Sequence, residues 1–403
     1  MHIKYTLITH YLVFLVVLML QLVLKGKSIF AADDSTRDIL KRGFYGVSQE
    51  NSMLRLSIEE AMYLLDSRNA VCSSSKGELT FGALASRFWK AKKFMARYFA
   101  YKDWRDRGLV AKAPSAPYSE PVQNPLKKYP AEPQQLPHYK LTGVFFKSDL
   151  LTLVLENEQS RELYDRFWFG QYGAYKAADH GQLSKFDAYE TLYLIDKGIL
   201  SLENITRKEL VNYVSKRHKD FLSMYAVYSD WRDKGYVIKT GFKFGTNFRV
   251  YFPGARPGTG NGKEWTHSKH VIHVFPKNSR LLISEWARVI RVAHSVRKTF
   301  ILAVPGEQIP AKASIDFVLY HRHGGEAENP SNSAPKFAML ALGEEEYIGG
   351  RELAAAIAQA AKLKLDLLLA IVDRETAVTY YTVRRILLPR SDIEYYEIDW
   401  LQP

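Results

Sequence analysis

The sequence has very little cysteine: Cys72 is the only one among 403 residues. A single thiol excludes a disulfide framework and any zinc or iron–sulfur site built from several cysteines. Acidic residues are also in the minority, since 43 Asp and Glu stand against 56 Lys and Arg and leave a net charge of +13. This basic excess fits a polyanionic partner, either nucleic acid or an anionic membrane surface. The 25 tyrosines and 21 phenylalanines are suited to stacking on unpaired bases.

The longest apolar run, residues 11–24, is short as well. It has fourteen residues, fewer than the roughly 20 that a membrane-spanning helix needs. A signal peptide is the alternative interpretation, with Phe30-Ala31-Ala32 as its cleavage site. Against it, residues 29–37 resemble residues 153–161, which places them inside a folding unit. We therefore expect a cytoplasmic protein with an apolar extension over 1–24 and no membrane partner.

An internal repeat organises the first two thirds of the chain. FMARYFAYKDWRDRGLVAK (94–112) matches FLSMYAVYSDWRDKGYVIK (221–239) at a shift of 127 residues, and SIEEAMYLLD (57–66) matches DAYETLYLID (187–196) at a shift of 130. Earlier in the chain the shift is only 124. The second copy is therefore predicted to hold about six extra residues, between 170 and 186.

A fainter repeat organises the rest. Residues 274–304 resemble residues 341–371 at a shift of 67, and both read as strand, polar loop, amphipathic helix and strand. The patterns also predict one long helix over 209–234 and a strand over 317–322. Together they predict an α+β protein, made of repeated modules in which mixed β-sheet packs against helices.

Two segments are predicted to join these modules. Residues 113–138 contain seven of the sixteen prolines, as an extended, semi-rigid linker would, and residues 323–336 form a more flexible one. The first module has a front part only, the central unit is complete, and the last module has a rear part only. The predicted boundaries are an extension (1–24), a non-catalytic front module (25–112), a linker (113–138), the front domain (139–243) and catalytic domain (244–322) of the central unit, a linker (323–336) and a structural rear module (337–403).

Three histidines at spacings of three, His267, His270 and His273, suggest a metal site at first sight. In a strand this spacing sends neighbouring side chains to opposite faces, and no nearby acid or cysteine completes a ligand set. We therefore expect neither a metal nor a cofactor.

Three motifs resemble the archaeal tRNA-splicing endonucleases: VYSDWRDKGYVIKTGFKFGTNFRVY, THSKHVIHV and ISEWARVIRVAHSVRKTFILAV. GFYG (43–46), YKDWRDRG (101–108) and LLLAIVDRETAVTYYTVRRI (367–386) extend the resemblance to the outer modules. It implies N-terminal and nuclease-like C-terminal domains and cleavage of precursor tRNA at bulge–helix–bulge intron junctions without metal. The layout resembles the three-unit fused form known from small acidophilic archaea, of which two chains form a homodimer.

The same resemblance implies a catalytic trio: Tyr251 in FRVY, His267 in THSK and Lys298 in SVRK. RNA supplies its own nucleophile, the 2′-hydroxyl, so the enzyme must provide a base, an acid for the leaving 5′-oxygen and a cation for the charge that develops at phosphorus. Tyr251 would be the base, His267 the acid and Lys298 the cation, leaving a 2′,3′-cyclic phosphate and a 5′-hydroxyl. Taken singly, each has an ordinary alternative: strand packing, a surface histidine, and a lysine at a helix end.

The family also suggests two further contacts. Two arginines grip an extruded base by cation–π stacking; Arg291 matches the first, and Arg322 is the nearest basic residue for the second. An acidic loop docks one unit into another, and Asp373 and Glu375 are its candidates here. Solvated surface residues are the alternative for both arginines.

Two insertions depart from the family pattern. PGARPGTGNGK lengthens the span between Tyr251 and His267, and about six residues are added near Lys176. We expect Lys263 and Lys176 to contact RNA; the alternative is that both insertions are plain surface loops.

The second repeat provides an internal control. At the shift of 67, Leu365 and Ala334 stand opposite Lys298 and His267. The last module is therefore predicted to be a structural pseudo-unit, so that each chain has one active site. A non-catalytic RNA-binding or structural subunit is the alternative function, and the presence of the whole trio in one unit argues against it.

Overall fold

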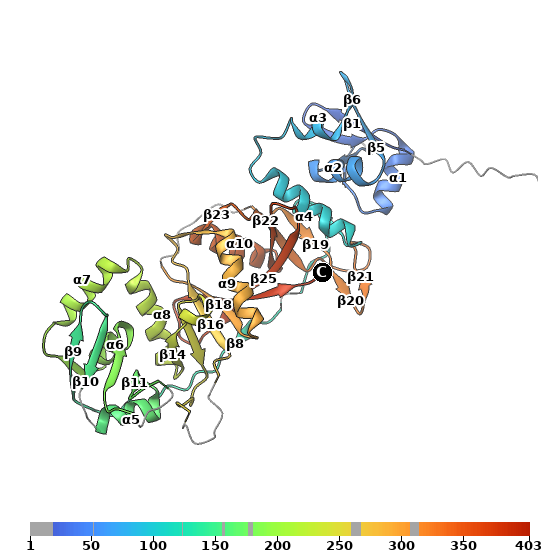
Figure 1. Cartoon of the computed structure of the whole chain (residues 1–403). Helices are drawn as coiled ribbons and strands as arrows, with labels where there is room; N and C mark the ends of the chain where they lie inside the picture. The colour runs from blue at the N-terminus through green and yellow to red at the C-terminus, as the bar shows by residue number, and fades with distance from the viewer. Residues whose placement is uncertain are drawn as a thin grey trace, which may run out of the picture. The chain divides into compact units, whose positions relative to one another are not determined.

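The computed structural model describes residues 19–403, apart from 51, 123, 155–157, 176–179, 259–266 and 307–313. The chain forms two compact units, residues 1–102 and 103–403, and each is described by itself (Figure 1).

The first unit contains a six-stranded mixed sheet in the order β3-β4-β2-β1-β5-β6. Leu20, Leu22 and Leu24 are buried on alternate positions of β1. The predicted extension over 1–24 is therefore wrong at its boundary, because the second half of the apolar run is a core strand. The elements of this unit are β1 (Leu20–Lys25), β2 (Ser28–Ala31), α1 (Asp34–Arg42), β3 (Val47–Ser48), β4 (Leu54–Leu56), α2 (Ile58–Ser67), β5 (Ala70–Ser74), β6 (Gly77–Leu79), α3 (Phe81–Ala85) and the start of α4 (Phe94–Asp106).

The second unit begins with a similar front domain, built on a five-stranded sheet in the order β11-β12-β10-β9-β13. Eleven residues separate β11 from β12, whereas five separate β3 from β4. This difference agrees with the six-residue insertion expected from the repeat. The elements are β9 (Leu141–Phe146), β10 (Leu151–Val154), α5 (Glu158–Phe167), β11 (Gln171–Tyr172), β12 (Ser184–Asp187), α6 (Ala188–Asp196), β13 (Leu200–Leu202), α7 (Arg207–Arg217) and α8 (Phe221–Asp233).

A shared buried glutamate marks the two front domains as copies. Glu60 closes a capping box at the start of α2, and Glu190 closes one at the start of α6. The same carboxylates accept a hydrogen bond of 2.8 Å from the backbone N–H of Gly46 and of Gly170, respectively. The repeat inferred from sequence therefore has a structural counterpart at these positions.

The single helix predicted over 209–234 is wrong. The chain makes two helices, α7 and α8, and the C-cap of α7, His218, is extended with φ −127° and ψ 95°. Leu210 and Val214 of α7 pack in a small hydrophobic cluster that Phe221, at the start of α8, joins. Trp231, near the end of α8, packs in a second and larger hydrophobic cluster. The two helices bury different faces, which explains the break.

The rear of the second unit is an eleven-stranded sheet in the order β14-β15-β16-β18-β26-β25-β24-β22-β19-β7, with β8 against β25. Its buried strands read as continuous apolar runs, as expected where both faces are covered. The elements are β7 (Ala111–Lys112), β8 (Lys127–Lys128), β14 (Val237–Thr240), the 3-10 helix η1 (Phe242–Phe244), β15 (Phe248–Tyr251), β16 (His270–Val274), β17 (Arg280–Leu282), α9 (Ile283–Ser295), β18 (Thr299–Val304), β19 (Phe317–Leu319), β20 (Arg322–His323), β21 (Glu326–Ala327), β22 (Phe337–Gly343), β23 (Tyr347–Gly349), α10 (Gly350–Lys362), β24 (Asp366–Val372), β25 (Val378–Leu387) and β26 (Glu394–Leu401).

This sheet consists of two matching halves. In one half β16 and β18 run parallel with α9 between them in sequence, and in the other β22 and β24 run parallel with α10 between them. The antiparallel pair β25–β26 joins the halves at the centre. We call the half with β14, β15, β16 and β18 the catalytic half and the half with β7, β19, β22 and β24 the structural half (Figure 1).

The halves are interleaved along the chain, which corrects two predicted boundaries. β19 pairs with β22 and β7, so residues 317–319 belong to the structural half and not to the domain predicted over 244–322. β26 pairs with β18, so residues 394–401 complete the catalytic half instead of the last module. The sequence could not reveal this exchange because strand pairing is a tertiary contact.

Equivalent anchors hold one helix against each half of the sheet, α8 in one case and α4 in the other. The Tyr395 hydroxyl donates to Asp230 of α8 and the Tyr380 hydroxyl donates to Asp103 of α4, both at 2.7 Å. Trp231 and Trp104, the next residue in each helix, are fully buried. The end of the first module and the last module therefore build one composite structural half.

Both linkers make ordered contacts. In the proline-rich segment 113–138, Glu132 N–H donates to Lys234 O at 2.9 Å. Gly235 has φ +89°, and a Cβ there would lie 2.0 Å from Glu132 O, so a side chain at this helix end would displace the linker. In 323–336, β20 and β21 form a short hairpin, so this segment is more structured than predicted.

Candidate active site

The catalytic trio converges on one hollow of about 450 Å³. Tyr251 ends β15, His267 precedes β16, and Lys298 lies in the turn between α9 and β18. Because β16 pairs with both β15 and β18, the adjacent ends of these strands carry the three side chains to one place. The structure thus brings together the residues that the motifs single out.

The front domain closes the other side of this hollow. Trp168 packs against Tyr251 with ring centroids 4.6 Å apart, and Tyr164 and Gln171 also line the wall. Trp168 has φ +51°, and the buried Arg232 guanidinium donates to its carbonyl at 3.3 Å. The front domain is therefore part of the site and fixes the wall that faces the phenol.

Burial raises the pKa of Tyr251 above its ordinary value of 10.0, while the nearby charge of Arg249 acts in the lowering direction. Only 4% of the residue is exposed. The net direction is opposite to what a base at neutral pH requires, so the free site holds a protonated phenol.

The Lys298 ammonium is held in place by Ser268. Its Nζ donates to Ser268 O and, at 2.9 Å, to Ser268 Oγ. It also lies 4.9 Å from the centre of the Phe244 ring. Burial, with a smaller contribution from the charge of Arg249, lowers the pKa of Lys298 from 10.5.

The three closely spaced histidines separate in space. His267 is exposed at the hollow, whereas His270 packs edge-on against Tyr129 and Phe252. His273 stacks on a buried phenylalanine. Burial lowers the pKa of both His270 and His273 to about 4. Only His267 is placed to exchange a proton with a ligand in the hollow.

A buried ionic cluster lies beside the trio. Lys239 Nζ donates to Glu190 Oε1 at 2.7 Å and to Gly170 O at 2.8 Å. Burial, and next the charge of Glu190, raises the pKa of Asp187, and burial lowers the pKa of Lys239. The cluster ties α6 of the front domain to β14 of the catalytic half, at the junction where the hollow forms.

Arg249 is a site residue that the motif reading missed. It lies two residues before Tyr251 on β15, and both line the hollow. The sequence signal was present, since alternate strand residues share a face and Arg249 is part of the FRVY motif.

A second hollow of about 540 Å³ contains Arg291 of α9 but not Arg322. Arg322 lies on β20 and donates to Arg107 O at 2.7 Å, so the structure does not bring it into the hollow that Arg291 lines. Trp400 of β26 lines the hollow instead and is 59% exposed. The sequence reading missed it because β26, not the strand over 317–319, adjoins β18.

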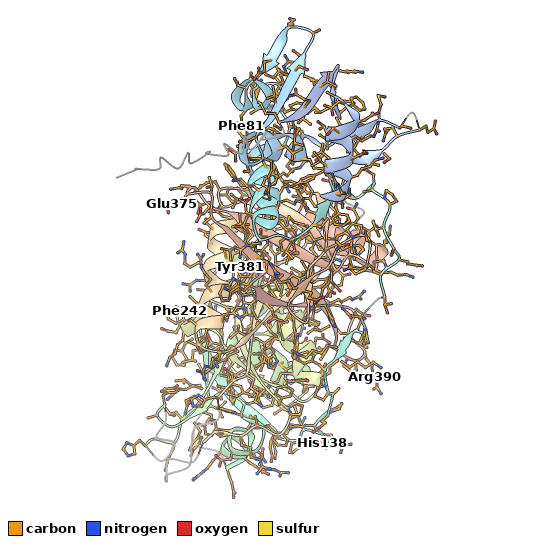
Figure 2. All side chains as sticks on the ribbon, turned by 90° about the vertical axis from the view of Figure 1, so that its right-hand side faces the viewer. Phe81, His138, Phe242, Glu375, Tyr381 and Arg390 are labelled. Atoms are coloured by element: carbon orange, nitrogen blue, oxygen red, sulfur yellow. The ribbon has the colours of Figure 1, made fainter. Side chains whose placement is uncertain are left out.

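The remaining predicted residues fall into two groups. Lys176 and Lys263 lie outside the described residues. Asp373 and Glu375 lie in the turn between β24 and β25, where Asp373 Oδ1 accepts hydrogen bonds of 2.9 Å from the N–H groups of Glu375 and Ala377. Glu375 is exposed and appears at the edge of the view in Figure 2, whereas Tyr381, on β25, is buried.

Comparison with known proteins agrees with this architecture. Residues 221–310, which include the trio, match the family model of the catalytic C-terminal domain of tRNA intron endonucleases, and residues 20–84 match that of the N-terminal domain. The tRNA-splicing endonuclease of Thermococcus kodakarensis is 32% identical over 168 residues, covering 41% of this chain and 90% of the relative. That of Methanopyrus kandleri is 36% identical over 135 residues (32% and 71%), and that of Methanosarcina mazei is 26% identical over 353 residues (71% and 95%).

The fold and these matches define an RNA-cleaving enzyme. The chain belongs to the tRNA intron endonuclease family, and its α+β architecture of N-terminal-type and catalytic domains confirms the predicted fold class. Within the described part of the chain, no helix is long and apolar enough to cross a membrane.

Proposed function

We propose that this chain cleaves intron-containing precursor tRNA at bulge–helix–bulge junctions by a metal-independent attack of the 2′-hydroxyl on the adjacent phosphate. The observation that carries the proposal is the convergence of Tyr251, His267 and Lys298 on a single hollow. A phenol, an imidazole and an ammonium are together sufficient for the proton transfers and charge stabilisation that this reaction needs.

The steps balance without a cofactor. Tyr251, in its phenolate form, accepts the proton of the 2′-hydroxyl as the hydroxyl oxygen bonds to phosphorus. His267 donates a proton to the 5′-oxygen as its bond to phosphorus breaks, and Lys298 stabilises the charge on the non-bridging oxygens. The products are a 2′,3′-cyclic phosphate and a 5′-hydroxyl.

The second hollow supports a role in holding the substrate. Arg291 and Trp400 line it together, and a nucleobase between a guanidinium and an indole would gain cation–π and stacking energy. We infer that an extruded bulge base binds there.

Each chain has one complete trio among its described residues, and an intron has two junctions. We therefore propose that two chains act together, with the turn carrying Asp373 and Glu375 as a docking element. Complementary charge at such a contact would determine register more than affinity.

The direct test is incubation of the purified chain with an intron-bearing precursor tRNA in excess EDTA, followed by end-group analysis. We expect cleavage with 2′,3′-cyclic phosphate and 5′-hydroxyl ends. Ends with 3′-hydroxyl and 5′-phosphate would contradict the mechanism, and RNA binding without cleavage would support a non-catalytic subunit.

A further inference from the structure

We propose that Arg249 is a fourth catalytic residue, whose guanidinium binds the non-bridging oxygens of the phosphate attacked by the 2′-hydroxyl. This inference rests on the proposed function and adds to it a second cation at the reacting phosphate.

The first argument is position. β15 pairs with β14 and β16 on its two sides, and its alternate residues Arg249 and Tyr251 face the hollow that also holds His267 and Lys298. The guanidinium carbon lies 5.8 Å from the centre of the Tyr251 ring. A phosphate that reaches the phenol is therefore also near the guanidinium.

The second argument is unbalanced charge. The residue directly across from Arg249 on β14 is another cation, Lys239, and like charges facing each other across strands are unfavourable. Lys239 is neutralised by Glu190 at 2.7 Å. Among the described residues no carboxylate forms an ion pair with Arg249, and its buried Nε has no hydrogen-bond partner. The guanidinium interacts with the Tyr251 hydroxyl, which carries no charge to balance it. A guanidinium that lines a hollow and has no carboxylate partner is an anion-binding group.

The other charged groups of the hollow do not compensate Arg249. Lys185 donates to Gly173 O at 2.6 Å, and Asp187 accepts from the backbone N–H of Glu190 at 2.8 Å. Lys298 adds a second cation, two of whose donor bonds already go to Ser268. The site therefore presents two neighbouring positive groups, and an anion between them would relieve their repulsion.

The third argument comes from the structural half. There Tyr320 N–H bonds to Val110 O, and Val318 pairs with Lys112 on β7 as Arg249 pairs with Lys239 on β14. The structural half thus keeps a tyrosine at the position of Tyr251 but has Val318 in place of Arg249. Valine supports the same strand pairing, so the arginine is not required by the fold.

The test uses Arg249→Val, which introduces the residue of the structural half, together with Arg249→Lys. Arg288→Gln, on the exposed side of α9, is the matched control. Single-turnover cleavage is measured with the protein in saturating excess over a bulge–helix–bulge RNA that carries either an Rp or an Sp phosphorothioate at the scissile position. Binding of the RNA and the melting temperature are measured in parallel.

We expect Arg249→Val to cleave about 10²- to 10³-fold more slowly, with binding changed less than about threefold and melting unchanged. We expect Arg249→Lys to recover part of the rate, because it keeps the charge but loses the planar fork. The wild-type preference between the two phosphorothioates should disappear in Arg249→Val, and Arg288→Gln should behave as wild type.

A folded Arg249→Val variant that cleaves within threefold of wild type would overturn the proposal. So would a slow variant that keeps the phosphorothioate preference, because its defect would then be structural. If Arg249→Val does not fold, Arg249→Lys is the test. A folded Arg249→Lys that cleaves within threefold of wild type, or that is slow but keeps the phosphorothioate preference, would overturn the proposal. Failure of the wild-type chain to cleave would instead contradict the proposed function.

Discussion

The catalytic and structural halves of the central sheet share a scaffold but differ in chemistry. Each has a parallel pair of strands joined by a helix, and each holds one helix through an Asp–Tyr hydrogen bond. Yet Leu365 precedes β24 where Lys298 precedes β18, and Val318 stands where Arg249 does. The apolar and anchoring residues are therefore shared by the two halves, and a few polar residues distinguish the half to which we assign the reaction.

The anchors should matter equally in both halves. Trp104→Ala and Trp231→Ala each remove a fully buried indole, and we expect each to cost about 3–5 kcal/mol of unfolding free energy. Urea denaturation checks this, with Trp89→Ala as the control because Trp89 is 71% exposed. A large effect from only one of the two buried substitutions would mean that the halves do not share their stability.

The equivalent positions Lys298 and Leu365 should separate chemistry from folding. We expect Lys298→Ala to lower the single-turnover rate about 10²- to 10³-fold, because a cation at the reacting phosphate is lost, with little change in melting temperature. Leu365→Ala should do the reverse, since it removes a buried side chain. Equal rate losses in the two variants would remove the distinction between the halves.

The two central strands, β25 and β26, should differ by a smaller amount, in their effect on RNA binding. Tyr381 on β25 pairs with Trp400 on β26. When YYTVRR (380–385) is aligned with YYEIDW (395–400), Arg385 stands at the position of Trp400. We expect Trp400→Ala to weaken binding of bulged RNA by about 1–3 kcal/mol and Arg385→Ala to have little effect. An abasic bulge nucleotide should abolish the difference between Trp400→Ala and wild type, and its persistence would exclude base stacking.

The two equivalent tyrosines should differ in their effect on the pH dependence. Because burial raises the pKa of Tyr251 above 10.0, the phenolate fraction increases about tenfold per pH unit below that pKa, and we expect the cleavage rate to rise with it. Tyr251→Phe should flatten this dependence. Burial also raises the pKa of Tyr320, to about 12, but Tyr320→Phe should leave the profile unchanged. A profile that is flat in the wild type would argue against Tyr251 as the base.

The motifs that resemble the family were enough to select Tyr251, His267 and Lys298, and the structure places these three side chains on one hollow. The sequence was not sufficient to show which residue shares a hollow with Arg291, since Arg322 is nearer in sequence whereas Trp400 lines the same hollow. The sequence also did not show that β26 completes the catalytic half and β19 the structural half. Which strand lies beside β18 depends on the packing of the whole sheet and not on local pattern. Arg249 lay within a recognised motif, but the role proposed for it rests on its place in the hollow and on its lack of an ion partner, neither of which the sequence shows.

The most direct test of the central claim, that the substrate's own 2′-hydroxyl is activated in this hollow, replaces one nucleotide. A precursor with a single 2′-deoxy substitution on the 5′ side of one scissile phosphate should bind as tightly as the unmodified RNA. We predict that it remains uncut at that junction and is cut normally at the other. Cleavage at the modified junction would show that water or another group is the nucleophile and would contradict the account.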